Sequence, residues 1–398
     1  MSQLALPQVI LKRGKAGAAI GRHPWVFSGM IDSVDGDPQD GDPVKVLRGE
    51  DRAFVAYGLH NSKSEIRIRL YSWNEAQSVD EDLFRRRIEA AVALRKDVLG
   101  LTDPSGARRL IFSEADGLSG LTVDEYGPYL VFQVTSAALH RKADLLADIL
   151  SEIRKPKGIL LRSSGEMAKK EGMPAEDRVL FGDVPTGRIP FVDHGIEFDV
   201  DLWGGQKTGF FLDQTENRVA AAQYAKGARV LDLYCYTGAF ALHCARAGAK
   251  EVVGVDSSGP AIQQADETAR RNRFQNARFV EDDVFRFLEA SVEGSYSLII
   301  VDPPRFAAAR ENKNNALRKY HRVNSEAMKR LERGGMLVTC SCSGRVSMHE
   351  FMGMLGSAAR RSGRFLQVLE LRGASRDHPF TPFCPESQYL KCVIARAQ

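Results

Sequence analysis

The sequence predicts an α/β protein whose C-terminal part is a Rossmann-like, doubly wound sheet. From residue 189 onward, apolar runs of strand length alternate with helical patterns, and such alternation is typical of a parallel sheet covered by helices. The stretch VLDLYCYTGAF (230–240) reads as a strand, a tight turn and the start of a helix. The next apolar run ends at Asp256, and an acid about 20 residues past such a turn can hydrogen-bond ribose hydroxyls. These observations predict a nucleoside-cofactor site at the carboxyl edge of the sheet.

The elements of this part can be placed one by one. Strands are expected at 228–233, 251–256, 277–281, 296–302, 334–341, 365–371 and 389–395. Helices are expected at 215–225, 239–247, 259–273, 283–290, 313–333 and 347–361. Because the last strands lie close together along the chain, we expect a seven-stranded sheet with an antiparallel pair at one edge.

The N-terminal residues, 1–72, predict a small β-barrel or open roll, because short apolar runs are separated by glycines and turns. Its expected strands are Val9–Leu11, Val44–Leu47, Ala53–Tyr57 and Ile66–Tyr71. Lys12 and Arg13 lie near Trp25 in the sequence, and basic residues beside an aromatic ring suit contacts with RNA. A solvated turn with Trp25 in the core explains the same residues.

The middle part, 73–188, predicts an α+β domain without a recognisable set of catalytic groups. Helices are expected at Ser78–Leu99 and Ala137–Ile153. Strands are expected at Leu110–Ser113, Leu118–Val123, Tyr129–Val134, Ile159–Arg162 and Arg178–Phe181. We therefore divide the chain into three domains, 1–72, 73–188 and 189–398.

Composition excludes several classes of protein. The content of 43% hydrophobic and 27% charged residues is that of a soluble globular protein. The sequence has no apolar run of membrane-spanning length, and its start does not have the residue order of a signal peptide, so we expect a cytoplasmic protein. Its six cysteines form no C-x-x-C pair, so neither a metal site nor a disulfide framework is expected.

Positive charge is local. The net charge is only +4, so a nucleic-acid surface has to come from clustering. Between 305 and 333 there are nine Lys or Arg residues against three Glu. A basic helix there is suited to polynucleotide phosphates, although a solvated helix face is equally consistent with the pattern.

The turn after the first Rossmann strand indicates which cofactor is bound. A dinucleotide needs G-x-G-x-x-G, because its pyrophosphate approaches the backbone closely. Here Tyr234 and Tyr236 stand where small residues are needed, and only Gly238 remains. The spacing from Asp232 to Gly238 resembles the D-x-G-x-G-x-G motif of class I S-adenosylmethionine (SAM) methyltransferases, with two glycines replaced. By itself the turn also fits an ordinary strand–helix connection.

Asp302-Pro303-Pro304 follows another apolar strand and is expected at the edge of the sheet where ligands bind. The prolines fix the backbone and remove N–H donors, which leaves carbonyls and Asp302 to face a substrate. In amino-methylating enzymes, the matching tetrapeptide ends in an aromatic residue. Here the residue is Arg305, which makes an exocyclic amine a less favoured target.

Thr339-Cys340-Ser341-Cys342-Ser343 also follows a strand. A cysteine beside a SAM site can add to C6 of a pyrimidine and so make C5 nucleophilic. A thiol of ordinary pKa is mostly protonated at neutral pH, so the site has to favour the thiolate, and Arg305 or Lys207 is suited to this. Buried cysteines are often only small apolar residues, so the motif acquires meaning from its neighbours.

The combination of motifs resembles one family, the RlmI-type methyltransferases that make 5-methylcytidine in large-subunit (23S) ribosomal RNA. The resemblance covers nearly the whole chain. It rests on HPWVFSG (23–29), ADGLSGLTVDEYG (115–127), GQKTGFFLDQ (205–214), DLYCYTGAFA (232–241), VDPPRF (301–306) and SCSG (341–344). It implies an N-terminal PUA domain, a central α+β domain and a C-terminal class I methyltransferase domain, with SAM as cofactor and ribosomal RNA as partner.

The resemblance also implies roles for single residues. Cys342 would be the nucleophile, and Asp302 would hold the cytosine edge and adjoin the cofactor. The cofactor site would be formed by Asp232, Tyr234, Gly238, Asp256, Ser257 and Asp283, with Lys207 and Phe210 closing it. The substrate RNA would meet Pro303, Pro304, Arg305, Lys12, Arg13 and Trp25.

The chain departs from the family pattern in places. Arg305 replaces a usual Lys, and Thr215 stands where Arg is expected. Cys340 is an additional thiol that strand alternation would place on the same face as Cys342. Two alternatives to a cytosine-C5 methyltransferase stay open, an amino-directed methyltransferase and a non-catalytic RNA-binding or assembly factor. The sequence is compatible with a homodimer but does not require one.

Overall fold

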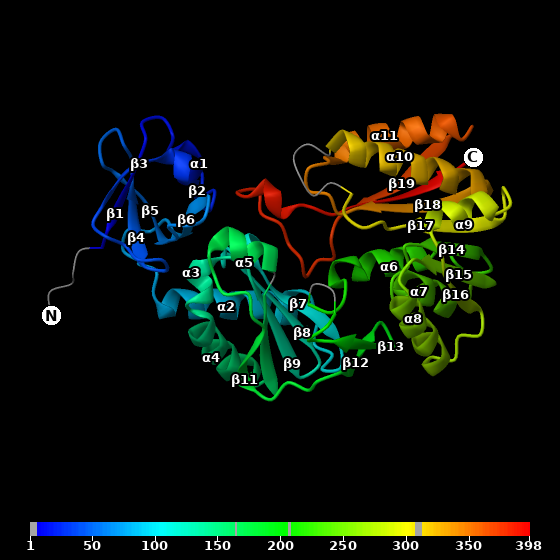
Figure 1. The fold of residues 1–398 in the computed structure, drawn as a ribbon, viewed down its shortest axis with the longest axis horizontal. Coiled ribbons are helices and arrows are strands. Elements are labelled where there is room, and N and C mark those ends of the chain that lie inside the picture. Colours follow the sequence, from blue (N-terminus) through cyan, green and yellow to red (C-terminus); the bar gives the residue numbers. More distant parts are fainter. Residues whose placement is uncertain (1–5, 164, 206–207, 307–312) are drawn as a thin grey trace. The chain divides into compact units, whose positions relative to one another are not determined.

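The computed structural model describes residues 6–163, 165–205, 208–306 and 313–398 (Figure 1). These residues form two compact units. The first comprises Met1–Phe191, Asp199–Leu212 and Arg376–Ser387. The second comprises Val192–Phe198, Asp213–Ser375 and Gln388–Gln398. No helix among the described residues combines the length and apolar character that a membrane span requires.

The first unit begins with a six-stranded sheet of order β2-β6-β5-β4-β1-β3. Its strands are β1 (Gln8–Leu11), β2 (Trp25–Phe27), β3 (Ile31–Asp35), β4 (Pro43–Leu47), β5 (Phe54–His60) and β6 (Ile66–Ser72), and the short helix α1 spans Gly17–Ile20. The four strands expected from apolar runs are present. Strands β2 and β3 were not predicted, because β2 is short and β3 is mostly exposed or half-buried.

The first unit continues with a five-stranded sheet of order β11-β10-β9-β8-β7. Its strands are β7 (Ala107–Phe112), β8 (Leu121–Tyr126), β9 (Tyr129–Val134), β10 (Gly158–Arg162) and β11 (Arg178–Gly182). Its helices are α2 (Glu81–Ala93), α3 (Ala137–His140), α4 (Ala143–Arg154) and α5 (Gly165–Glu171). Asp80 caps α2 by accepting the Leu83 N–H at 2.9 Å. The helix expected over Ala137–Ile153 is interrupted between α3 and α4.

The second unit is built on a seven-stranded sheet of order β16-β15-β14-β17-β18-β20-β19. Its strands are β14 (Arg229–Leu233), β15 (Glu251–Asp256), β16 (Ala277–Glu281), β17 (Tyr296–Val301), β18 (Leu331–Ser341), β19 (Leu366–Arg372) and β20 (Lys391–Ala397). The strands from β16 to β18 are parallel, and β20 is antiparallel to both β18 and β19. The expected parallel sheet with an antiparallel pair at one edge is therefore confirmed.

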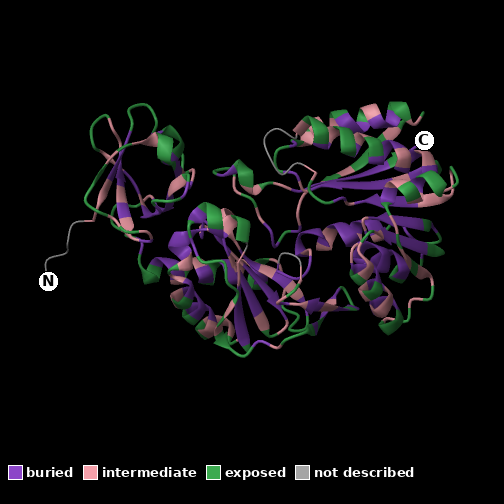
Figure 2. Ribbon diagram, viewed as in Figure 1, coloured by how far each residue is buried: buried purple, intermediate pink, exposed green. Residues whose placement is uncertain are grey.

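Helices cover both faces of this sheet. They are α6 (Thr215–Ala222), α7 (Ala239–Arg246), α8 (Gly259–Arg271), α9 (Val284–Ala290), α10 (Lys313–Arg330) and α11 (Met348–Arg361). Successive strand residues point to opposite faces. Leu231 and Leu233 pack with Tyr320 of α10 and Phe351 of α11, whereas Val230 packs with Phe240 of α7. Figure 2 shows the central strands of this sheet as the buried centre of the unit, whereas the edge strands β16 and β19 are largely exposed or half-buried.

Strands β12 (Arg188–Asp193) and β13 (Ile196–Asp201), which were not predicted from the sequence, form a two-stranded sheet. In the second unit, Asp193 contacts His194 Nδ1 at 2.8 Å and Arg218 Nη1 at 3.1 Å. Burial alone would raise the pKa of Asp193, but the His194 hydrogen bond and the charges of His243 and Arg218 outweigh it and lower that pKa to about 2.

This shift predicts acid lability of the second unit. Because the folded-state pKa of Asp193 lies below the unfolded value, its stabilisation is complete above about pH 4 and is lost as pH falls toward 2. We expect Asp193→Asn to lower the free energy of unfolding at pH 7 by on the order of 2 kcal/mol, and the difference from wild type to shrink between pH 4 and 2. Circular dichroism during chemical denaturation measures this, with exposed Glu197→Gln as control. A difference that is constant across that range would contradict the assignment.

Candidate active site

Three parallel strands of the second unit end at the same level. Leu233 of β14 pairs with Val301 of β17, and Val301 pairs with Thr339 of β18. The segments that follow these residues therefore leave the sheet at one carboxyl edge, where open α/β sheets bind ligands. They carry the turn that begins at Tyr234, the Asp302 segment and the segment around Cys342.

The turn after β14 has a left-handed backbone at three alternate positions. The φ angles are 62° at Tyr234, 49° at Tyr236 and 78° at Gly238. Glycine adopts such angles without cost, whereas larger residues are strained in them. A Cβ at Gly238 would lie 2.6 Å from the ring of Phe279. This close approach explains why glycine remains at 238, and the positive φ at both tyrosines marks them as the replaced glycines of the motif.

Asp256 at the end of β15 organises this turn. Its Oδ2 accepts the Tyr236 N–H and its Oδ1 accepts the Ser258 N–H, both at 2.9 Å. Its side chain is half-buried and Ser257 beside it is exposed. The carboxylate is thus fixed in orientation at the strand end, where the remaining lone pairs of its oxygens can accept hydrogen bonds from hydroxyl groups.

Asp232 is the most deeply placed acid of the edge. It is 1% exposed, and its Oδ2 accepts the Ala241 N–H at 2.9 Å. Its Oδ1 is buried without a hydrogen-bond partner among the described residues. Burial raises the pKa of Asp232 well above its usual value, and the charges of Asp302 and Asp256 act in the same direction. A buried acceptor without a partner in an acidic surrounding suits a cationic group.

Asp283 has a structural task in addition to the predicted one. Its Oδ1 caps helix α9 by accepting the N–H groups of Phe285 and Arg286, both at 3.0 Å. The side chain is exposed, and its charge adds to the raised pKa of Tyr234, of which the main cause is burial. Asp283 therefore acts electrostatically on the turn that carries Tyr234.

The two cysteines of β18 and its end differ in exposure. Cys340 is completely buried and pairs with Cys392 across β18 and β20. Hydrogen bonding to the Cys392 thiol and burial raise the pKa of Cys340 well above its usual value. Cys342 lies just beyond the end of β18 and is partly exposed. Because the strand ends between them, strand alternation does not relate the two thiols, and only Cys342 reaches solvent.

Polar side chains lie around Cys342. The Tyr320 hydroxyl lies 3.2 Å from Ser343 Oγ. Burial raises the pKa of Tyr320, hydrogen bonds from Ser341 and Ser343 oppose this, and the charges of Cys342 and Asp302 raise it further. Asp302 is half-buried, Pro303 is buried, and Pro304 and Arg305 are exposed. The predicted nucleophile, Asp302 and the predicted cofactor acids thus belong to one edge of one unit.

Phe210, Lys12, Arg13 and Trp25 belong to the first unit. Lys207 is outside the described residues. Phe210 belongs to the first unit, where its N–H donates to the Tyr126 hydroxyl at 3.1 Å and its ring lies 4.9 Å from that of Phe191. Of the predicted RNA contacts in the first unit, Lys12 and Arg13 are exposed, while the Trp25 indole donates to Glu114 at 3.0 Å.

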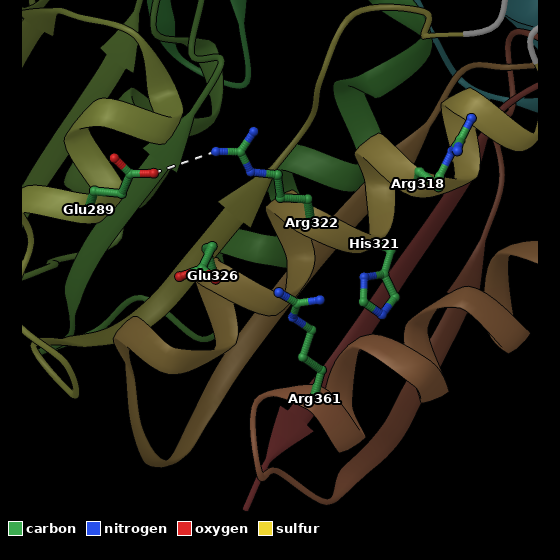
Figure 3. A pocket seen from close by; sticks show the side chains of 6 residues that line it. All are labelled: Glu289, Arg318, His321, Arg322, Glu326 and Arg361. Atoms are coloured by element: carbon green, nitrogen blue, oxygen red, sulfur yellow. Dashed lines mark hydrogen bonds and ion pairs between the residues drawn. The ribbon is translucent and has the colours of Figure 1, made fainter.

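Acidic side chains lie beside some of the basic residues of segment 305–333. A pocket of about 510 Å³ lies in the second unit, to which α10 contributes Arg318 and Arg322, and Figure 3 shows the side chains that line it. It is lined by Glu289, Arg318, His321, Arg322, Glu326 and Arg361. Arg322 lies 3.5 Å from Glu289, so the acids offset part of the positive charge of this face.

Sequence reasoning missed Lys391, the first residue of β20. It is 5% exposed, and its Nζ donates to the carbonyl oxygens of Ser343 at 2.6 Å and Tyr389 at 2.8 Å. The signal in the sequence was a single lysine at the start of an otherwise apolar strand, KCVIARA, since a lysine is rarely buried without a specific partner.

The strand order and the cofactor turn define the chain as a Rossmann-fold, SAM-dependent methyltransferase. A family model of S-adenosylmethionine-dependent methyltransferases matches residues 178–375, and a model of PUA-like domains matches residues 9–73. The chain belongs to the family of ribosomal RNA large subunit methyltransferase I. It is 38% identical to members from Aeromonas hydrophila, over 98% of this chain and 99% of the relative, and from Photobacterium profundum, over 96% and 97%.

Solved structures share the fold over the whole chain. A putative SAM-dependent methyltransferase from Streptococcus mutans has a TM-score of 0.81 at 19% identity and covers 98% of this chain and 99% of its own. A putative methyltransferase complexed with SAH has a TM-score of 0.82 at 20% identity and the same coverage. At these identities the likeness concerns the fold.

Proposed function

We propose that the protein methylates C5 of a cytosine in large-subunit ribosomal RNA and that Cys342 is the nucleophile. The observation that supports this most directly is the placement of a partly exposed Cys342 at the same carboxyl edge as Asp232 and Asp302. The relatives named for large-subunit ribosomal RNA point to the substrate. Because the ring atoms are hidden in a stack, the base has to be unstacked or single-stranded.

The proposed reaction begins and ends with the Cys342 thiolate. The Cys342 thiolate adds to C6 of cytosine, so an S–C6 bond forms while the C5–C6 double bond opens. C5 becomes nucleophilic and takes the methyl group. Loss of the C5 proton to a base then restores the double bond as the S–C6 bond breaks, which returns the thiolate. Asp302 holds the cytosine edge through this sequence, and Pro303 and Pro304 keep its segment rigid.

The residues of the edge fit SAM. Its sulfonium supplies the methyl group. The buried, unpartnered Asp232 Oδ1 fits the ammonium of its methionine part, and the oriented Asp256 carboxylate fits its ribose hydroxyls. Tyr234, Gly238, Ser257 and Asp283 complete the proposed cofactor-binding set of the second unit.

The proposed RNA contacts use both units. Lys12, Arg13 and Trp25 belong to the part that a PUA-like model matches, and Arg305 adjoins the proposed target site. We retain 1–72, 73–188 and 189–398 as the proposed domain division, with the first domain binding RNA.

A trapping assay tests this function. The protein is incubated with SAM and a large-subunit RNA transcript that contains 5-fluorocytidine. Because fluorine cannot leave C5 as a proton does, we expect a covalent protein–RNA adduct on a denaturing gel. Methylation of ordinary RNA without any adduct would instead favour an amino-directed methyltransferase that uses Asp302-Pro303-Pro304. SAM binding without turnover would favour a non-catalytic RNA-binding or assembly factor.

Asp232→Asn should weaken SAM binding by about 10- to 100-fold, as expected for a lost charge-assisted hydrogen bond. Asparagine keeps the acceptor for Ala241 N–H but presents an amide instead of a carboxylate oxygen. Calorimetric titration with SAM measures the change. Glu251→Gln, at the exposed amino end of β15, is the matched control, and Asp232→Asn binding as tightly as this control would contradict the assignment.

A further inference from the structure

Lys391, on the neighbouring strand β20, contacts the segment that carries Cys342. In the antiparallel ladder between β18 and β20, Lys391 is the partner of Ser341. Its ammonium bonds the Ser343 carbonyl oxygen at 2.6 Å. Lys391 therefore contacts the chain on both sides of Cys342. Its neighbour Cys392 packs into the cluster that contains Phe240 of α7, so alternation directs Lys391 to the other face, which α10 and α11 cover.

The ammonium is charged and electrostatically linked to the thiol. Burial lowers the pKa of Lys391 to about 8; the Cys342 charge opposes this shift, Arg305 adds to it, and Glu350 of α11 opposes it. The group is thus mostly protonated at pH 7. A thiolate that favours the ammonium is favoured by it to the same extent, because the coupling of two titrating groups is mutual.

Other titratable groups face the same place from the elements packed against it. Asp302 follows β17 and Tyr320 lies on α10. Tyr320 interacts electrostatically with both Cys342 and Asp302. Asp302 disfavours a second negative charge, and Tyr320 adds none at pH 7, because a phenol is ordinarily neutral there and burial raises the pKa of Tyr320 further. Among the described residues, Lys391 and the exposed Arg305 are cations linked to this place, and Lys391 is fixed by two hydrogen bonds.

We propose that Lys391 is the positioning residue for Cys342, because its ammonium fixes the 341–343 segment through the Ser343 carbonyl and stabilises the Cys342 thiolate. This inference rests on the proposed function only for the role of the thiolate as the nucleophile in methylation. The lysine binds no substrate in this role. It supplies the buried positive charge that an attacking thiolate requires at neutral pH.

The test measures Cys342 alkylation by iodoacetamide between pH 6 and 10, without RNA or SAM, and follows the modified peptide by mass spectrometry. In Lys391→Gln and Lys391→Met we expect the apparent pKa of Cys342 to rise by about one unit, so that alkylation at pH 7 slows by about tenfold. Lys391→Arg, which keeps the charge, should recover most of the rate. Lys226→Met, at an exposed lysine before β14, should match wild type.

Glutamine keeps an N–H donor for the Ser343 carbonyl, so the comparison of Gln with Arg separates charge from a structural bridge, even if the Met variant fails to fold. Gln and Met profiles that superimpose on wild type, or an Arg variant as slow as Gln, would overturn the proposal. The assay is independent of methylation. A missing RNA adduct would reject the proposed function, whereas an unchanged alkylation profile would reject only the role of Lys391.

Discussion

We expect Cys342→Ala to abolish both RNA methylation and the 5-fluorocytidine adduct, because without the sulfur no bond to C6 can form and C5 stays unreactive. Loss of a covalent nucleophile typically removes several orders of magnitude in rate. Transfer of radioactive methyl groups to RNA measures activity, and a denaturing gel measures the adduct. SAM binding should stay near the wild-type value, since Cys342 has no assigned contact with the cofactor.

Cys340→Ala is the matched control for this variant. Cys340 is fully buried beside Cys392, so its truncation affects packing but should leave the adduct in place. An adduct that survives in Cys342→Ala and disappears in Cys340→Ala would move the nucleophile to Cys340. Methylation at near wild-type rate in Cys342→Ala would reject the covalent route and favour transfer to an amino group.

The second large effect concerns the stability of the first unit. Arg95 is 1% exposed, and its guanidinium bonds Asp116 at 2.7 Å, the Arg109 carbonyl at 3.0 Å and the Asp377 carbonyl at 2.7 Å. Arg95→Met leaves the Asp116 carboxylate buried without this partner. Breaking such a buried pair costs about 3–5 kcal/mol, and we expect a loss of that size in the free energy of unfolding.

Tryptophan fluorescence during urea denaturation reports this loss selectively. The three tryptophans, Trp25, Trp73 and Trp203, all lie in the first unit. Arg86→Met is the matched control, because Arg86 lies on helix α2 and is exposed. If Arg95→Met unfolds at the same urea concentration as Arg86→Met, the ion pair contributes no net stability.

Sequence patterns determined the second unit in detail. The strands expected at 251–256 and 277–281 are β15 and β16 with the same bounds, and each of the expected helices there is present. Buried parallel strands read as apolar runs and their helices as separate periodic patterns, so local signals suffice. The first unit was harder, because β2 is only three residues long and β3 is mostly exposed or half-buried.

The sequence by itself determined the cofactor class, the seven strands with an antiparallel pair at one edge and the segments that carry Asp232, Asp256, Asp302 and Cys342, because strand ends and turns are local features. Only the tertiary structure decided which of two nearby thiols reaches solvent, since this depends on Cys392 in a strand about 50 residues further along the chain. The same strand brings Lys391 to the Ser343 carbonyl. Burial and charge at a site depend on contacts between distant segments, and spacing along one segment does not contain them.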